Sequence, residues 1–202
     1  MKLFVNPPSP YARKVRVAVR ELGLADRVEE IETTVAPHKP NEAYGRINPL
    51  MKVPALETDD GMVLLNSPVL CEYIDAAGGN RLIPAPGPAR WDALRRQALG
   101  DGVLDAAILR RYELVARPEA LRWDDWLKGQ QMKVDLALDV AEREAGGWGK
   151  RFDIGDIAIA CTLEWLDFRF AGDDWRKRRP KLAAWLSGVA ARPSMTATKP
   201  HA

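Results

Sequence analysis

The chain has 202 residues, of which 47% are hydrophobic and 29% charged, a globular composition long enough for one large domain or two small ones. Its 30 basic and 28 acidic side chains leave a net charge of +2, which gives no reason to expect a nucleic-acid partner or a membrane surface. No apolar run reaches membrane-spanning length, and the first residues lack the apolar core of a signal peptide, so we expect a cytoplasmic protein.

Strand and helix patterns alternate over the first 77 residues. The predicted strands cover residues 2–5, 28–31, 53–57 and 62–65, and the predicted helices cover residues 10–22 and 67–77. A crossover helix between the first two strands favours parallel pairing, whereas the Asp60-Gly61 turn favours an antiparallel hairpin. This order predicts a small α/β domain.

The rest of the chain shows helical patterns only. Three prolines and a glycine between Pro84 and Pro88 are typical of a stiff linker, and four helices are predicted over residues 91–115, 119–145, 154–171 and 181–191. We therefore expect an α/β domain at residues 1–78, a linker at 79–88 and an all-helical domain at 89–202. The basic run at residues 176–179 is interpreted as a solvated loop, and the segment from Ser194 onward as a loosely packed tail.

Two cysteines, Cys71 and Cys161, lie in apolar helical patterns, with no Cys-x-x-Cys pair in the chain. We expect both to be buried free thiols, which fits a reducing compartment. The spacing predicts no zinc site and no dithiol chemistry, and we expect no bound metal.

Ser9-Pro10 follows the first strand directly. Serine is favoured as a helix N-cap and proline as the first helical residue, so the Ser9 hydroxyl is expected beside free backbone amides and the positive end of the helix dipole. Such a place stabilises an anion, including a thiolate. The same pattern is also typical of a serine that only caps its helix.

Two further segments lie at strand boundaries of the same domain. Lys52-Val53-Pro54 enters the third strand. A cis proline there would turn the Val53 backbone outward to pair with an extended peptide. A trans proline is also typical of a strand start. Asn66-Ser67-Pro68 opens the next helix, so Ser67 is expected to offer a hydroxyl and free amides to a carboxylate. Asn66 can accept a hydrogen bond from a ligand ammonium group.

In this combination the sequence resembles the cytosolic glutathione transferase superfamily, with the serine-type Ser-Pro motif, over essentially its full length. The resemblance rests on SPYARKVR at 9–16, INPLMKVPAL at 47–56, NSP at 66–68, EYI at 72–74 and FDIGDIAIA at 152–160. It implies a thioredoxin-like N-terminal domain and an all-α C-terminal domain. Asp153 and Asp156 stand at N-cap and N3 of a helix, and the resemblance assigns them to folding.

The resemblance also implies roles at the glutathione site. Ser9 would activate the glutathione thiol, the Val53 backbone ahead of a cis Pro54 would pair with the cysteinyl part, and Ser67 would hold the γ-glutamyl carboxylate. Lys52, and less strongly His38, would contact the glycyl carboxylate. Asn66 stands where many members have Glu or Gln, which predicts weaker recognition of the γ-glutamyl amino group. Met51 replaces a common glycine, which is tolerable where the backbone needs no positive φ.

Glutathione is thus the expected co-substrate, attacking a small hydrophobic electrophile in a detoxifying conjugation. Serine at position 9 cannot form a mixed disulfide, which favours conjugation over thiol-disulfide exchange. We expect the electrophile near Tyr11 and Tyr112, with Arg111 as an anion contact and Trp165 as a core residue close by. The family further implies a homodimer.

Two alternatives remain open at this point. One is a regulatory or interaction protein on the same fold, resembling the bacterial stringent-starvation proteins. The other is a different glutathione-dependent enzyme, such as an isomerase, dehalogenase or lyase. Retention of Ser9, Val53 and Ser67 favours an enzyme, because an interaction protein needs no peptide site.

Overall fold

The computed structural model describes residues 1–149 and 151–201 and begins with a four-stranded sheet of order β2-β1-β3-β4. The strands are β1 (Lys2–Val5), β2 (Glu29–Glu32), β3 (Ala55–Glu57) and β4 (Val63–Leu65). β1 pairs parallel with β2 and antiparallel with β3, and β3 and β4 form the expected antiparallel hairpin. The parallel pairing predicted from the crossover helix is confirmed.

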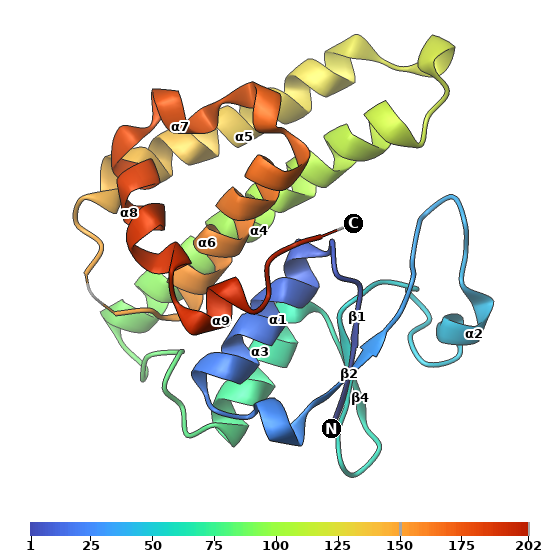
Figure 1. The fold of residues 1–202 in the computed structure, drawn as a ribbon, viewed down its shortest axis with the longest axis vertical. Helices are drawn as coiled ribbons and strands as arrows, with labels where there is room; N and C mark the ends of the chain where they lie inside the picture. Colours follow the sequence, from blue (N-terminus) through green and yellow to red (C-terminus); the bar gives the residue numbers. More distant parts are fainter. Residues whose placement is uncertain (150, 202) are drawn as a thin grey trace.

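Alternation along β1 and β3 sends side chains to opposite faces of this sheet. Leu3, Val5 and Leu56 pack in the main core with α1 (Pro10–Glu21) and α3 (Ser67–Ala77), which cover one face (Figure 1). Phe4 and Ala55 face the other way, toward the short helix α2 (Glu42–Gly45). No helix was predicted over the α2 segment.

Helices make up the rest of the described chain. They are α4 (Pro88–Val115), α5 (Asp124–Ala145), α6 (Ile154–Arg169), α7 (Trp175–Arg178), α8 (Pro180–Ala190) and α9 (Pro193–Thr196). Short 3-10 turns cover Ala25–Arg27, Glu119–Leu121 and Ala171–Asp173. The thioredoxin-like domain followed by a helical domain is therefore as expected. None of the described helices combines the length and apolarity that a membrane span requires.

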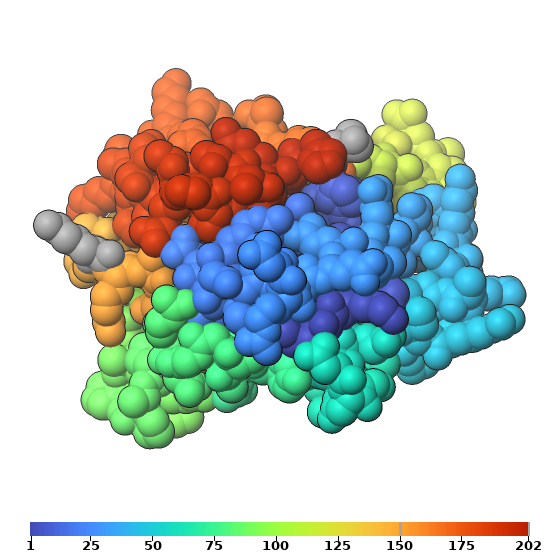
Figure 2. Space-filling view, turned by 60° about the horizontal axis from the view of Figure 1, so that its bottom comes forward, coloured from blue at the N-terminus to red at the C-terminus, as the bar shows by residue number. Residues whose placement is uncertain are grey.

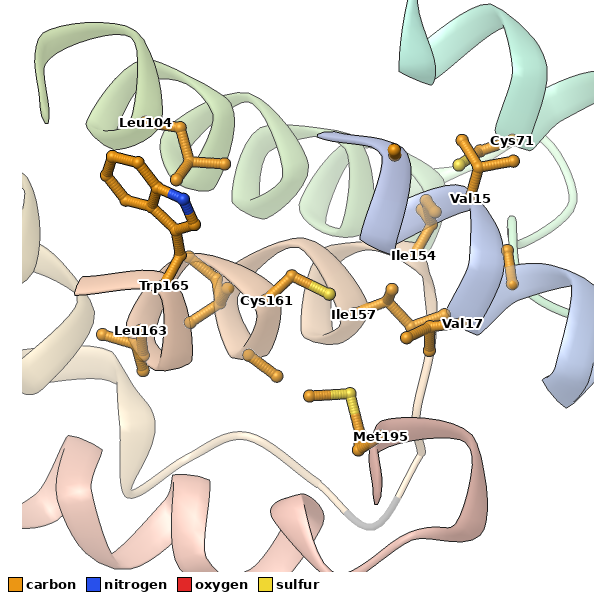
Figure 3. Close-up of a cluster of buried hydrophobic side chains, with 14 of the residues drawn as sticks. Val15, Val17, Cys71, Leu104, Ile154, Ile157, Cys161, Leu163, Trp165 and Met195 are labelled. Carbon is orange, nitrogen blue, oxygen red and sulfur yellow. The ribbon is translucent and has the colours of Figure 1, made fainter. Parts of the chain in front are cut away.

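α6 is the central helix of the helical domain, and twelve of its side chains are buried, among them Ile157, Cys161 and Trp165. Figure 3 shows these side chains between α1, α4 and the C-terminal segment. Asp153 caps α6, accepting from the amides of Gly155 and Asp156, while Asp156 accepts from the amide of Asp153 at 3.0 Å. The predicted capping box is confirmed.

The capping box is also the anchor between α6 and α4. The buried Arg96 of α4 donates to both Asp153, at 2.8 Å, and Asp156. A Cβ on Gly155 would lie 2.6 Å from the Ala93 carbonyl oxygen, so only glycine permits this approach of the two helices. The start of α6 therefore lies beside Ala93 and Arg96 of α4, and because Arg110 further along α4 donates to Asp173 beyond the end of α6, the two helices run in the same direction.

Residues 81–83 of the linker are held against α3. The buried Asp75 carboxylate of α3 accepts from the amides of Arg81, Leu82 and Ile83 at 2.8, 2.8 and 2.9 Å. The Leu82 carbonyl in turn accepts from the amide of Ile154 at the start of α6. This segment joins both domains through hydrogen bonds as well as through the chain.

Two expectations about the C-terminal region were wrong. The basic run is mostly helix α7, and Arg179, 2% exposed, donates to Asp139 at 2.9 Å and Asp135 at 3.0 Å. The tail is packed rather than loose, because Met195 is fully buried and its carbonyl accepts from Arg13 of α1 at 3.1 Å. Figure 2 shows this red C-terminal segment lying directly on the blue N-terminal domain. Sequence periodicity missed both features because contacts with residues distant in sequence, not local patterns, hold them.

Candidate functional site

A cleft of about 670 Å³ lies between the two domains. That size suits a ligand of a few hundred daltons. The thioredoxin-like domain contributes Tyr11, Asn48, Leu50, Lys52, Val53, Pro54, Leu65, Asn66, Ser67 and Pro68, and α4 contributes Leu94, Gln97, Ala98, Asp101, Gly102 and Asp105. Six of the residues predicted from the sequence thus lie together along one wall.

The Val53 edge of the cleft is held from behind. The Lys52 carbonyl accepts from the Tyr44 hydroxyl at 2.9 Å and from Nδ2 of Asn48 at 2.7 Å, so α2 and the loop after it fix the backbone just before Val53. The Val53–Pro54 peptide bond is cis. Among the described residues, no protein group hydrogen bonds to the amide or carbonyl of Val53. This backbone edge is therefore available to an extended ligand.

Ser67 opens α3 at one end of the cleft. Its side chain is 2% exposed, and its Oγ has no hydrogen-bond partner among the described residues. The preceding residue, Asn66, has a φ of +73°, a backbone conformation that is unfavourable for residues other than glycine. Backbone strain of this kind is frequent at ligand sites. The Asn66 backbone conformation and the start of α3 thus place the buried Ser67 hydroxyl and the first amides of the helix at the cleft.

Gln97 was missed by the sequence analysis. It reaches the cleft from α4, is 5% exposed, and its Nε2 is buried without a hydrogen-bond partner in the described structure. Nothing in its local pattern distinguishes it from any other polar residue of an amphipathic helix. A buried donor without a partner costs about 1–3 kcal/mol, which favours a ligand that accepts from it.

Ser9 caps α1, with its Oγ accepting from the Ala12 amide at 3.2 Å. It does not itself line the cleft but lies two residues before Tyr11, which does. The loop before Ser9 is fixed from the helical domain, because Nε1 of the buried Trp165 donates to the Pro8 carbonyl at 3.0 Å. The capping and the core interpretation of Trp165 are both confirmed. Since the Ser9 oxygen accepts the cap hydrogen bond, its own proton remains available for donation.

Two acidic residues of α4 face this region. The Tyr11 hydroxyl donates to Asp105, and burial together with this hydrogen bond raises the pKa of Tyr11, so the phenol stays protonated. Asp101 pairs with the buried Nζ of Lys14 at 2.7 and 2.6 Å. Burial raises the pKa of Asp101, against the opposing effect of Lys14. Tyr11 is therefore committed to Asp105 as a donor.

Besides Ser9, three other predicted residues lie outside the cleft. His38 is exposed in the loop before α2. Tyr112 lines a second, mostly apolar hollow of about 630 Å³ at the far end of α4, together with Leu109, Glu113, Ala116, Arg117, Pro118, Leu121, Trp123 and Trp126. Arg111, also near the end of α4, lines neither.

The other expectations concern cysteines, metals and Met51. Cys71 and Cys161 are buried free thiols, as predicted, and burial raises the pKa of each, to about 12 and about 11. Within the described part of the chain, no group of three or more His, Cys, Asp or Glu residues is arranged to hold a metal. Met51 has a φ of +48°, so the condition under which methionine could replace glycine without strain, a backbone with no positive φ, is not met.

Comparison with known proteins agrees with this geometry. The sequence matches the family description "Glutathione S-transferase, N-terminal domain" over residues 8–77 and "Glutathione S-transferase, C-terminal domain" over residues 124–187. It is 31% identical to the Escherichia coli "Uncharacterized GST-like protein YibF" across 99% of this chain and 98% of that protein.

Two solved structures from Pseudomonas fluorescens, both of a glutathione transferase family member, are also similar. One, with bound glutathione, is 45% identical with a TM-score of 0.96, covering 100% of this chain and 99% of that one. The other, with bound S-(propanoic acid)-glutathione, is 44% identical with a TM-score of 0.92, covering 100% of both chains. Because the likeness spans both domains and nearly every residue, this chain belongs to the glutathione S-transferase superfamily.

Proposed function

We propose that the chain binds glutathione in the cleft between its domains and activates the thiol for attack on a small electrophile. The observation that carries this proposal is the pair of buried polar groups without partners, Ser67 Oγ and Gln97 Nε2, which line one cleft from two domains. The open backbone edge of Val53 lies in the same cleft, as a peptide ligand requires.

Each part of glutathione has a partner of matching chemistry in this arrangement. The γ-glutamyl carboxylate accepts from Ser67, Gln97 and the first amides of α3, while Asn66 accepts from the γ-glutamyl ammonium. The cysteinyl part pairs with the Val53 backbone. Lys52, exposed at the cleft wall, attracts the glycyl carboxylate. His38 joins this last contact only if its loop moves toward the cleft on binding.

Ser9 then donates its hydroxyl proton to the glutathione sulfur and so favours the thiolate. A thiol of pKa about 8.5 is only a few per cent ionised at neutral pH, and lowering it by about two units requires roughly 2.7 kcal/mol. One hydrogen bond to a charged sulfur and the N-terminus of α1 together are of that magnitude. Tyr11 cannot replace Ser9 in this role, because its proton is held by Asp105.

The thiolate attacks an electrophilic carbon and forms a C–S bond, while a leaving group departs with the electron pair of the bond that breaks. Serine at position 9 favours this conjugation over disulfide exchange, which would need a second sulfur there. The Pseudomonas fluorescens relatives with bound glutathione and bound S-(propanoic acid)-glutathione support binding of the same tripeptide by this chain.

We also propose a homodimer in the cytoplasm. Met62, Val69 and Trp91 are large apolar side chains 50%, 47% and 69% exposed, on or beside β4, α3 and α4, and an interface would cover them. The two free thiols suit a reducing compartment. Sedimentation equilibrium at micromolar concentration tests the dimer, and a monomer mass would refute it.

The test of function combines binding, thiol titration and turnover. Calorimetry is expected to give a glutathione Kd in the micromolar to low-millimolar range for wild type and for Ser9→Ala. Absorbance at 240 nm against pH is expected to place the bound thiol about two units below its free value in wild type but near it in Ser9→Ala. With 1-chloro-2,4-dinitrobenzene, chloride release is expected from wild type only.

Absence of glutathione binding by wild type would refute the proposal and favour the interaction-protein alternative. Binding and thiol activation without conjugation of this or other electrophiles would instead favour a different glutathione-dependent enzyme.

A further inference from the structure

The shared C-terminal ends of α4 and α6 carry an unusual pair of arginines. α4 and α6 run parallel from the Arg96–Asp153 ion pair at their starts to Arg110, which donates to Asp173 just beyond α6 at 3.0 Å. Arg111 and Arg169 occupy this far end, one on each helix. Both are half-buried.

Neither guanidinium has an acceptor among the described residues. Arg169 stacks on its neighbour Phe168, 3.9 Å from the ring centroid, but its Nε is buried and makes no hydrogen bond within the described chain. Every other buried or half-buried arginine of the described chain donates to a carboxylate or a backbone carbonyl. Those residues are Arg13, Arg16, Arg20, Arg90, Arg96, Arg110, Arg122, Arg176, Arg179 and Arg192.

The two cations also act on each other. Burial lowers the pKa of Arg169, and repulsion from Arg111 lowers it further. Two like charges at the adjoining ends of α4 and α6, partly removed from water and without a counter-charge among the described residues, are stabilised by an anion that accepts from both.

The position of the pair relative to Ser9 follows from helix geometry. Trp165 contacts Pro8, next to Ser9, and Arg169 lies one turn further along the same face of α6, a rise of about 6 Å. On α4, Gln97 and Asp105 both line the cleft, Asp105 accepts from Tyr11, and Arg111 lies about 9 Å beyond Asp105 on the side away from Gln97. The pair is therefore on the far side of the thiol from the γ-glutamyl end.

We propose that Arg111 and Arg169 together bind a carboxylate carried by the electrophile, so that this enzyme selects acidic electrophiles. The proposal rests on the proposed function, because the arginine pair can bind the electrophile's carboxylate during the reaction only if the glutathione thiol lies beside Ser9. A planar guanidinium matches the two oxygens of a carboxylate, and charge-assisted hydrogen bonds of this kind are among the strongest in proteins. The carboxylate therefore orients the reacting carbon toward the sulfur.

The experiment compares matched pairs of glutathione adducts by calorimetry. The probes are S-(2-carboxyethyl)- and S-(3-carboxypropyl)-glutathione, each against its carbamoyl analogue, which has the same shape without the charge. For wild type, at least one carboxylate is expected to bind about tenfold or more tightly than its amide, the effect of one hydrogen bond to a charged group.

Arg111→Gln and Arg169→Gln are each expected to bring that preference below about threefold, while the affinity for glutathione itself stays within about twofold. Arg143→Gln is the matched control, because it removes an exposed charge of α5 that has no ion-pair partner in the described structure. It is expected to keep the full preference. Circular dichroism confirms folding of each variant, and either arginine variant alone suffices for the test.

Three results would overturn the inference: equal binding of carboxylate and amide by wild type, an undiminished preference in both arginine variants, or an equal loss in the Arg143→Gln control. If wild type binds glutathione but shows one of these, only the inference fails. If wild type binds no glutathione at all, the proposed function fails, and the inference falls with it.

Discussion

Replacing Ser67 with alanine is expected to separate ligand binding from stability. The Ser67 hydroxyl is 2% exposed and has no hydrogen-bond partner among the described residues, so the folded protein gains nothing from it. An unsatisfied buried polar group costs about 1–3 kcal/mol, and alanine is also the better helix former. The free energy of unfolding of Ser67→Ala is therefore expected to equal that of wild type or to exceed it by about 1 kcal/mol.

Glutathione binding should change in the opposite direction. A hydrogen bond to a charged carboxylate contributes about 1.5–3 kcal/mol, which corresponds to a Kd roughly 10- to 150-fold weaker in Ser67→Ala. Urea unfolding followed by tryptophan fluorescence gives the stability, and calorimetry gives the Kd. Ser187→Ala is the matched control, since Ser187 is exposed and its hydroxyl bonds within its own helix.

Either of two results would refute this reasoning. A loss of more than about 1 kcal/mol in the free energy of unfolding would mean that the hydroxyl has a structural partner. An unchanged Kd would mean that no ligand group reaches Ser67.

Three further substitutions are expected to act at other points. Asp156→Ala removes half of the capping box and leaves the buried Arg96 short of a partner, so urea unfolding should show a loss of about 3–5 kcal/mol. Burial raises the pKa of Glu21, but hydrogen bonds from Arg192 and Ser194 outweigh burial and hold this pKa below its ordinary value of 4.5. The Glu21 carboxylate therefore stabilises the folded protein above pH 4.5, and this stability is lost as the pH falls through the lowered pKa. Glu21→Gln should flatten the acid limb of the curve of unfolding free energy against pH. Tyr11→Phe should leave the pKa of bound glutathione within about 0.3 units of wild type, measured at 240 nm, because the Tyr11 proton is held by a carboxylate.

Each of these has a contradicting outcome. Asp92→Ala, which removes an exposed partner of Arg96, should cost less than about 1 kcal/mol, and an equal loss from Asp92 and Asp156 would refute the buried network. An unchanged acid limb in Glu21→Gln would show that the ion pair with Arg192 contributes nothing to stability. A rise of the thiol pKa in Tyr11→Phe would move the activating role from Ser9 to Tyr11.

Local features of the fold and the site could be predicted from the sequence. Ser9-Pro10 and the aspartates that open α6 are capping signals whose physics lies within four residues, and the structure has both caps. The hairpin was predicted because Asp60-Gly61 is a turn signal between two short apolar runs. The helix start at Ser67 was predicted because a Ser-Pro pair follows the fourth strand directly, as it does at Ser9.

Features that depend on distant residues could not be predicted. Gln97 looks like any polar helix position until the fold buries it in the wall of the cleft that Ser67 also lines. Arg179 was expected to be solvated and the C-terminal segment loosely packed, because their partners, Asp139 and Arg13, lie far away in sequence. The positive φ of Met51 could not be predicted either, because methionine disfavours the left-handed conformation that the backbone takes there.

The three amides held by Asp75 have a consequence for how the cleft works. These hydrogen bonds fix the backbone of residues 81–83, where the chain passes from one domain to the other. The Leu82 carbonyl accepts from the Ile154 amide and so ties the same segment to the start of α6. A hinge needs backbone dihedrals that are free to turn, and here the hydrogen bonds restrain them on both sides. We therefore expect the two domains to keep their separation when a ligand binds, so that a ligand is selected by how well it fits the opening between them.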